Sequence, residues 1–183
     1  LYSDRLSVIQ KLKGKIKKRL GDSIFSFEEI PFADAVGRLL LKRKSTLAAA
    51  ESCTGGVLSS LICQCPGASR YFRGAVTAYS NEAKRDLLNV PLKTIQDFGA
   101  VSPQTAREMA AGVSRIFQTD YGISITGIAG PAGGTKQKPV GLIFIGISNQ
   151  GRLRVWREFF RGDRLQIQAK AAKRALYYLW RTI

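Results

Sequence analysis

The sequence contains no histidine, and this absence narrows the chemistry that the protein can perform. Histidine is the usual general base near neutral pH and a ligand in most zinc sites, so other residues must take these roles if they are filled. The acidic residues are also few, with 13 Asp and Glu among 183 residues, and they do not cluster. We therefore expect a protein that uses no catalytic metal ion and no cofactor.

Cysteines and long apolar runs are scarce as well. The three cysteines, Cys53, Cys63 and Cys65, argue against a disulfide framework and favour a reducing compartment. Cys63 and Cys65 lie in an apolar run, which predicts buried thiols. No apolar run approaches the ~20 residues of a membrane span, and no signal-peptide pattern opens the chain. The sequence therefore predicts a cytoplasmic protein without a membrane partner.

The charge of the chain is strongly one-sided, with a formal net charge of +16 and an isoelectric point of about 10.2. Such a charge suits an anionic partner, which could be a nucleic acid, an acidic protein or a phosphorylated small molecule. The basic residues gather at 11–20 and 170–181, but neither segment matches a nucleic-acid-binding motif. A generally basic surface explains the charge equally simply. Nucleic acid is thus a permitted partner that the sequence does not favour.

Hydrophobic periodicity divides the chain into two parts. Residues 6–20 carry apolar side chains at helical spacing, and Gly21-Asp22 is expected to end this helix. Residues 23–27 are expected to be extended. The chain opens on Leu1 rather than Met, so we expect a piece of a longer protein. The predicted division is a helical linker segment at 1–33 and a domain at 34–183.

Within the domain, strand patterns alternate with helix patterns. Strands are predicted at 46–50, 74–79, 122–126, 140–148 and 153–160. Helices are predicted from Phe32 to about residue 44 and at 55–64, 81–88, 103–117 and the C-terminus. This order predicts an α/β fold, namely a three-layer α/β/α sandwich with a mixed β-sheet, preceded by a short helical segment.

Helix ends and helix faces can also be predicted. Asn81 and Ser102 are expected to be N-caps, and Asp163 is a possible cap of the C-terminal helix. The buried face of that helix is expected to carry apolar residues at helical spacing, listed here in chain order: Leu165, Ala169, Ala172, Leu176 and Leu179.

Three glycine- or serine-rich junctions follow predicted strands, at 51–56, 79–84 and 126–134, and they should meet at one edge of the sheet. At the first, Ser52 is a candidate nucleophile beside a helix N-terminus, whose N–H groups could stabilise an oxyanion. Gly55 would let the backbone approach a ligand. The alternative is a tight turn in which Ser52 or Thr54 caps the helix.

The second junction offers a base in place of histidine. Lys84 is expected in the first turn of a helix, where the helix dipole and partial burial would lower its pKa. A neutral lysine amine can accept the proton of a serine hydroxyl, and Tyr79 could relay that proton or orient the pair. The alternative is that Lys84 is one of 29 basic residues on a solvated surface.

The third junction resembles a phosphate-binding loop but lacks the Gly-Lys pair of the P-loop motif. Thr126 and Gly127 stand at its start, where they could contact a substrate, although a flexible connection would give the same pattern. Further along, Arg164 could hold a phosphate with its forked guanidinium, or it could be an ordinary surface arginine.

Together these stretches closely resemble the CinA C-terminal family of nicotinamide-nucleotide amidases, also called NMN deamidases. The resemblance covers about residues 34–183 and rests on AESCTGG (50–56), YFRGAVTAYSNEAK (71–84), GAVS (99–102), ITGIAGPAGG (125–134), KPVG (138–141) and FRGDR (160–164). Residues 20–26 are similar to the segment that joins this domain to an upstream molybdopterin-binding-like domain in full-length CinA proteins.

The resemblance implies hydrolysis of the carboxamide of nicotinamide mononucleotide (NMN) to nicotinic acid mononucleotide and ammonia, in pyridine-nucleotide salvage. It implies that Ser52 is the nucleophile and that Lys84 and Tyr79 are its partners. Thr54, Gly55, Thr126, Gly127 and Arg164 would bind the substrate. A homodimer is expected. The alternative function is a non-catalytic competence- or damage-related module that binds an anionic partner.

Overall fold

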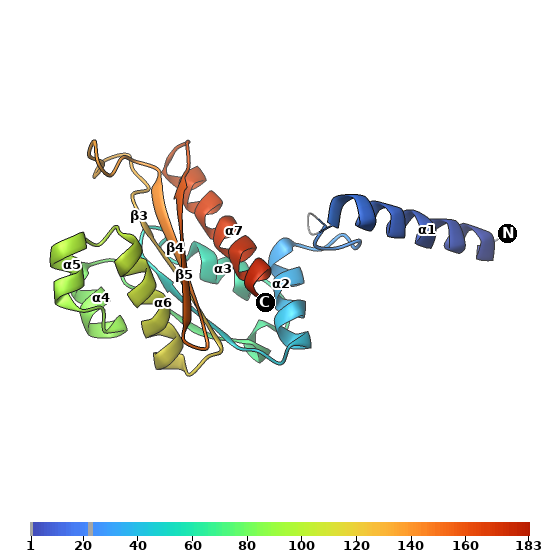
Figure 1. Ribbon diagram of the computed structural model, residues 1–183, viewed down its shortest axis with the longest axis horizontal. Helices are drawn as coiled ribbons and strands as arrows, with labels where there is room; N and C mark the ends of the chain where they lie inside the picture. Colours follow the sequence, from blue (N-terminus) through green and yellow to red (C-terminus); the bar gives the residue numbers. More distant parts are fainter. Residues whose placement is uncertain (1, 22–23) are drawn as a thin grey trace.

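The computed structural model describes residues 2–21 and 24–183 (Figure 1). Its helices and strands follow in the order α1 (Tyr2–Leu20), α2 (Phe32–Lys42), β1 (Leu47–Glu51), α3 (Val57–Cys63), the 3₁₀ helix η2 (Ala68–Arg70), β2 (Phe72–Thr77), α4 (Asn81–Leu88), α5 (Leu92–Phe98), α6 (Pro103–Phe117), β3 (Tyr121–Gly127), β4 (Leu142–Asn149), β5 (Arg152–Phe159) and α7 (Arg164–Thr182).

The five strands form one mixed sheet in the order β2-β1-β3-β4-β5. In the first half of the sheet the strands are parallel, because β1 runs parallel to both of its neighbours, β2 and β3. The second half is antiparallel, because β4 forms a hairpin with β5 and also pairs with β3. The carboxyl ends of β1, β2 and β3 therefore lie at the same edge of the sheet.

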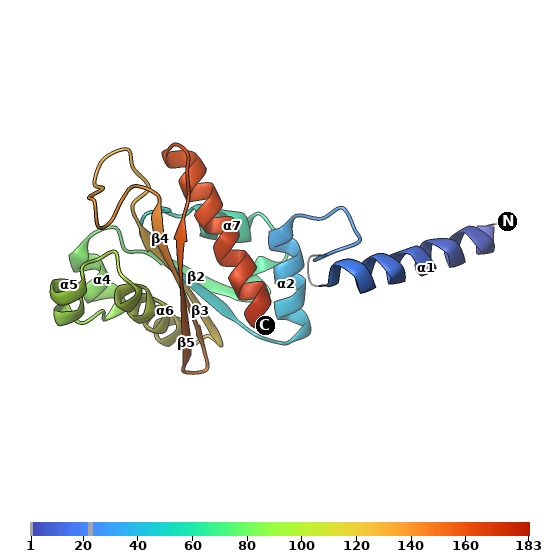
Figure 2. The same ribbon diagram turned by 45° about the horizontal axis from the view of Figure 1, so that its top comes forward.

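Helices cover both faces of the sheet, which confirms the predicted three-layer sandwich. The helices α2, α3 and α7 lie on one side and α4, α5 and α6 on the other (Figures 1 and 2). Every residue of β1 is buried, and three of its five residues are alanines that leave room for helices on both sides. Leu47 and Ala49 belong to the core under α7, whereas Ala48 and Ala50 belong to the core under α6.

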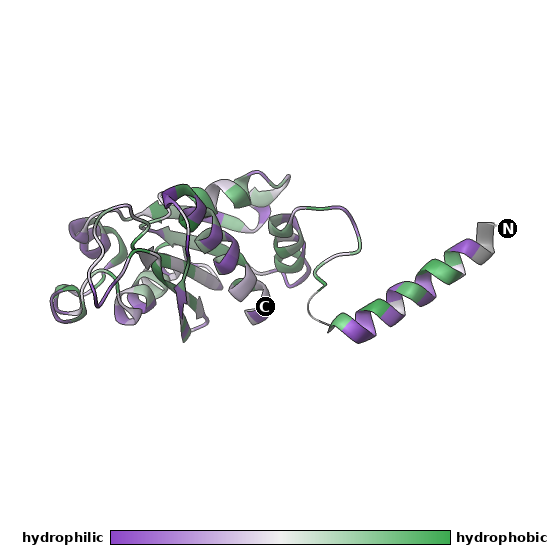
Figure 3. Cartoon of the chain, turned by 90° about the horizontal axis from the view of Figure 1, so that it is seen from above, coloured by the Kyte–Doolittle hydropathy of each residue, from purple (hydrophilic) through white to green (hydrophobic). Residues whose placement is uncertain are grey.

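The first helix extends away from the sandwich (Figures 1 and 3). Its apolar residues recur on one side, as the hydropathy colours of Figure 3 show. These side chains are exposed rather than packed: Leu6, Ile9, Leu12, Ile16 and Leu20. The predicted amphipathic helix is thus confirmed, and the division into a linker at 1–33 and a domain at 34–183 stays a prediction.

The last strand, β5, lies at an edge of the sheet. Three of its exposed side chains are arginines, Arg152, Arg154 and Arg157, and the strand ends at the exposed Phe159. Its turn to β4 uses Gln150 and Gly151 with φ values of 47° and 82°, which is the left-handed conformation that a two-residue hairpin needs.

Two predictions about helix ends and faces were wrong. The N-cap of α4 is Ser80 rather than Asn81, because the Ser80 hydroxyl accepts the N–H of Ala83. On α7 the buried arc is centred near Ala171 and Ala175, so that Leu165 and Ala169 lie at its margin, and Leu165 is 75% exposed. Because successive residues are about 100° apart around a helix, an error of one residue in the centre of the arc is enough to move a residue to its margin.

Other expectations were met only in part. Cys65 is buried but Cys63 is exposed, since the two residues lie on different sides of the chain as α3 ends. Residues 24–27 form bends and no strand, and the expected end of the first helix at Asp22 lies outside the described residues, as does Ser23. In the part of the chain described, no helix combines the length and the apolar character needed to cross a membrane.

Candidate active site

The three predicted junctions meet at the carboxyl edge of the parallel strands, as the topology requires. There they enclose a cavity of about 240 Å³. Ser52 enters it from the end of β1, Tyr79 from the segment after β2, and Gly127 from the end of β3. Cys53, the loop 128–133 and Arg164, at the start of α7, complete the lining.

Ser52 and Lys84 form a buried pair beside this cavity. The Nζ atom of Lys84 lies 3.1 Å from the Oγ atom of Ser52, although the residues are 32 positions apart in the chain. Lys84 is only 2% exposed. It reaches Ser52 because β1 and β2 are adjacent and parallel, and because α4 begins directly after β2. The alternative of a solvated surface lysine is therefore wrong.

The surroundings of the amine favour its neutral form. Burial lowers the pKa of Lys84, and this effect outweighs the charges of Cys53 and Glu82, which would raise it. The Nζ atom also donates to the carbonyl oxygens of Ala78, at 2.9 Å, and Ser80, at 3.3 Å. A neutral amine has two N–H groups, so those carbonyls can take both and leave the lone pair for the hydroxyl of Ser52.

Cys53, the neighbouring thiol, is held in an unreactive state. Its side chain is buried in the core under α7, and this burial raises the pKa of the thiol to about 12. Its carbonyl oxygen accepts a hydrogen bond of 2.7 Å from the buried Nε2 of Gln168 on α7. Gln168 thus ties the Ser52 turn to the last helix, a role that no sequence pattern indicated.

The N-terminus of α3 is occupied by a residue that the sequence analysis missed. Glu51 is fully buried, and its carboxylate accepts the N–H groups of Gly56, Leu58 and Ser59 as well as the hydroxyl of Ser59. These N–H groups are therefore not free to bind an oxyanion, contrary to the expectation for this junction. A glutamate at the end of a strand, four residues before a Gly-Gly helix start, is the signal that could have revealed the cap.

The turn between Ser52 and α3 is shaped by glycines. Gly55 and Gly56 have φ values of 60° and 105°, so both stand in the left-handed region that glycine adopts easily. Thr54, within this turn, is buried, and its hydroxyl has no hydrogen-bond partner among the described residues. Neither Ser52 nor Thr54 caps α3, because Glu51 does so.

Tyr79 and Arg164 meet at the mouth of the cavity. The Nη2 atom of Arg164 donates to the hydroxyl of Tyr79, and Nη1 donates to the carbonyl oxygen of Gly130 at 2.6 Å. Tyr79 is 59% exposed, so its hydroxyl is directed to Arg164 and not to the buried amine of Lys84. The structure thus places Tyr79 with the substrate-binding candidates and not in the Ser52–Lys84 pair.

The two candidates at the end of β3 differ in position. Gly127 lines the cavity, and a Cβ atom there would overlap the side chain of Ile143, so the position requires glycine. Thr126 is buried and donates its hydroxyl to the carbonyl oxygen of Ala100 at 2.7 Å, which joins β3 to the segment before α6. The structure does not bring Thr126 into the cavity lining.

Among the described residues no three His, Cys, Asp or Glu side chains stand close enough to hold a metal ion. The site is therefore composed of a serine, a buried amine, an exposed tyrosine–arginine pair and a glycine-rich loop.

Comparison with known proteins agrees with this arrangement. The pattern that defines the CinA C-terminal domain matches residues 29–183. The chain belongs to the CinA C-terminal domain family. A solved CinA superfamily protein from Klebsiella pneumoniae is similar to the chain, with 32% identity and a TM-score of 0.80 over 82% of this chain and 94% of that one. A CinA superfamily protein from Enterobacter cloacae shows 32% identity and a TM-score of 0.79, over 87% of this chain and 96% of that one.

Curated CinA relatives are longer than this chain. A CinA-like protein from Endomicrobium trichonymphae is 45% identical over 175 residues, which are 96% of this chain and 41% of that protein. A relative from Moorella thermoacetica, named as a competence-damage inducible protein, is 46% identical over 177 residues, which are 97% of this chain and 43% of that protein. The chain therefore spans less than half the length of these CinA relatives, whose names state no reaction.

Proposed function

We propose that the protein hydrolyses the carboxamide of nicotinamide mononucleotide, giving nicotinic acid mononucleotide and ammonia. The observation that carries the proposal is the contact of 3.1 Å between Nζ of the buried Lys84 and Oγ of Ser52 at the edge of a cavity. A buried amine with a lowered pKa beside a serine hydroxyl is the arrangement that a serine nucleophile requires when histidine is absent.

In the first half of the reaction, the neutral amine of Lys84 accepts the proton of the Ser52 hydroxyl while Oγ attacks the amide carbon. The C–N bond then breaks, and the Lys84 ammonium gives its proton to the leaving nitrogen, which departs as ammonia. The nicotinoyl group remains on Ser52 as an ester. The carbonyl oxygens of Ala78 and Ser80 hold the amine in place throughout, in either charge state.

In the second half, Lys84 acts again as the base. It takes a proton from a water molecule that attacks the ester carbon, and it returns this proton to Oγ of Ser52 as the acyl bond breaks. Nicotinic acid mononucleotide is released as its carboxylate. The proposed route gives every proton transfer to Lys84 and no step to a metal ion, so a chelator should leave the rate unchanged.

Substrate selection would fall to the exposed part of the cavity. The glycines of the loop 127–133 line the cavity without side chains, and Arg164 carries a fixed positive charge beside them. A mononucleotide phosphate is a dianion that a guanidinium binds well. Tyr79 holds the guanidinium of Arg164 from one side, so it would act on substrate binding rather than on proton transfer.

Ammonia release from NMN tests the proposal most directly. Ser52→Ala should lower kcat by at least about 1,000-fold, because it removes the atom that forms the acyl bond. The adjacent Cys53→Ala is the matched control and should keep most of the activity, since the Cys53 thiol is buried and protonated. An active Ser52→Ala variant, or loss of activity in Cys53→Ala with an unchanged unfolding midpoint, would contradict the assignment.

A further inference from the structure

A second hollow, of about 1020 Å³, lies between α7, the end of β5 and the segment before α2. We call it the α7 groove, and it shares no lining residue with the cavity at Ser52. Phe25, Phe159 and Tyr177 line it with rings that are more than one-third exposed. Leaving several aromatic rings exposed to water together costs free energy, and such a patch is typical of a surface that binds a ligand or partner.

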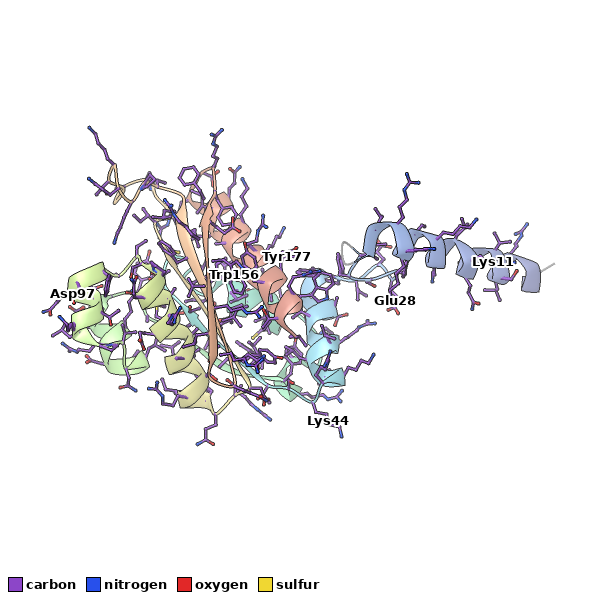
Figure 4. All side chains as sticks on the ribbon, in the orientation of Figure 1. Lys11, Glu28, Lys44, Asp97, Trp156 and Tyr177 are labelled. Carbon is purple, nitrogen blue, oxygen red and sulfur yellow. The ribbon has the colours of Figure 1, made fainter. Side chains whose placement is uncertain are left out.

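The rings of the groove are arranged as a connected row. The Phe25 ring lies 4.9 Å from that of Phe32, which lies 5.9 Å from that of Trp180, which in turn lies 6.2 Å from Tyr177. The ring of Tyr177 also lies 5.7 Å from that of Tyr178, which stacks on Trp156 of β5 at 4.3 Å; Figure 4 labels Trp156 and Tyr177. Packing against one another fixes the rings, so a planar ligand could stack on them at little cost in side-chain entropy.

The same groove is positively charged. Arg161, Lys170, Lys173 and Arg174 line it, and the described residues of the lining include no acidic side chain. The last three stand on α7 at spacings of three and four, in one stripe with Tyr177, which lies three residues beyond Arg174. Arg174 is partly compensated, because its Nε atom lies 3.6 Å from the carboxylate of Glu158 on β5. From Lys170 to the end of the stripe at Arg181 the helix rises about 16 Å, which is longer than one nucleotide.

We propose that the α7 groove binds single-stranded nucleic acid. Cations along a groove attract successive phosphates, while exposed rings stack on unpaired bases, and these two features together are what such strands require. The sequence of α7 alone does not show this combination of rings and cations, because Phe25 and Phe159 come next to the α7 side chains only in the folded chain. A duplex offers no free base faces to the rings and should bind more weakly.

The charge argues against a second copy of the chain as the occupant. Two copies would each bring the same basic stripe to the contact, and the whole chain carries +16. An acidic protein segment would satisfy the cations but would need apolar side chains at matching positions to cover the rings, whereas every nucleotide brings both a phosphate and a base. The single strand accounts for both features of the groove.

The test is binding of a fluorescently labelled 12-nucleotide oligothymidylate, followed by anisotropy in a series of salt concentrations. Tyr177→Ala should weaken binding about five-fold or more, because it removes a stacking ring. Lys173→Ala should weaken binding and make the slope of log K against log salt shallower by about 0.7, the value for one lost phosphate contact on a single strand. Lys173 is exposed, so Lys173→Ala should leave the unfolding midpoint unchanged. Tyr177→Ala also removes the ring contacts with Tyr178 and Trp180, so binding is measured well below the unfolding midpoint of each variant.

Matched controls come from the opposite helical layer. Phe98→Ala removes an exposed ring on α5, and Arg107→Ala removes an exposed charge on α6. Both should bind the strand as the unaltered protein does. The lysines of α1 will also attract a polyanion, so loss of charge alone does not decide the test. The comparison of Tyr177→Ala with Phe98→Ala is decisive, because both variants remove a ring and keep the charge.

Three results would overturn the proposal. The first is equal weakening by the groove variants and the control variants. The second is binding of inorganic polyphosphate, which has no bases, as tightly as the oligonucleotide with no effect of Tyr177→Ala. The third is sedimentation that shows a dimer broken by Tyr177→Ala without any binding of the strand, since the groove would then be a contact between copies.

Discussion

The charge state of one side chain, Lys84, links activity to stability. Burial lowers its pKa in the folded protein, so between that lowered value and the ordinary 10.5 the unfolded chain binds more protons than the folded one. At lower pH the folded protein bears the cost of burying a charged Lys84. As pH rises through this window that cost disappears, so the free energy of unfolding increases. The same rise in pH creates the neutral amine, so the rate should increase across the same window.

Urea unfolding of the protein and of Lys84→Met at about pH 7, 8 and 9 measures this link. The uncharged variant should be more stable at the lowest pH, and its advantage should shrink as pH rises. Titrating groups that do not interact with Lys84 cancel in the difference between the two proteins. A difference that stays constant with pH would show that Lys84 is not titrating in this range.

Arg164 offers a second prediction at the scale of one residue. If it binds the phosphate, Arg164→Ala should lower kcat/KM for NMN by about ten- to a hundred-fold, the value of one charge-assisted contact. Nicotinamide riboside lacks the phosphate and should lose much less. Arg161→Ala, an exposed arginine three residues away, is the control and should change neither value. Equal losses for both substrates with Arg164→Ala would place Arg164 in the chemistry or the fold instead.

At the scale of the element, α3 depends on one buried carboxylate. Glu51→Ala would leave the N–H groups of Gly56, Leu58 and Ser59 without their acceptor, so the free energy of unfolding should fall by roughly 2–4 kcal/mol. Asp163→Ala removes the N-cap of α7, which is exposed, and should cost about 1 kcal/mol. Urea unfolding measures the loss of unfolding free energy in each variant. An equal loss in the two variants would mean that burial adds nothing to the stabilising effect of the Glu51 cap.

Most elements could be predicted from the sequence, because their signals are local. Ser102 and Pro103 begin α6 as expected, and the hairpin of β4 and β5 turns at the predicted glycine. The cap of α4 was misplaced by one residue, since Ser80 and Asn81 are equally good caps by type. The helix α5 was missed because only Ile95 of its seven residues is buried, so the segment shows no apolar period.

The candidate site could also be predicted only in part. The meeting of Ser52 with Lys84 could be predicted, because parallel strands bring their following segments to one edge. The places of Gln168 and Thr126 could not, because each depends on a hydrogen bond whose partner is set by packing. A single sequence does not distinguish a polar side chain that is buried from one that is exposed.

At the scale of the whole molecule, α1 stands apart from the sandwich (Figure 1). A chain shortened to residues 21–183 should unfold with the same free energy to within about 0.5 kcal/mol, because the apolar side chains of α1 are exposed and contribute little burial. Urea unfolding of the two chains makes this comparison. A loss of several kcal/mol would show that α1 packs on the sandwich in solution.

The arginine-bearing edge strand β5 has a consequence for crowded conditions. An edge strand leaves backbone N–H and C=O groups unpaired, and such a row can recruit a strand from another molecule and begin a fibril. Arg152, Arg154 and Arg157 place a repeating positive charge along this row. Two such edges repel each other when they approach. The charge pattern of β5 therefore acts as protection against aggregation, independent of any ligand that the rest of the basic surface attracts.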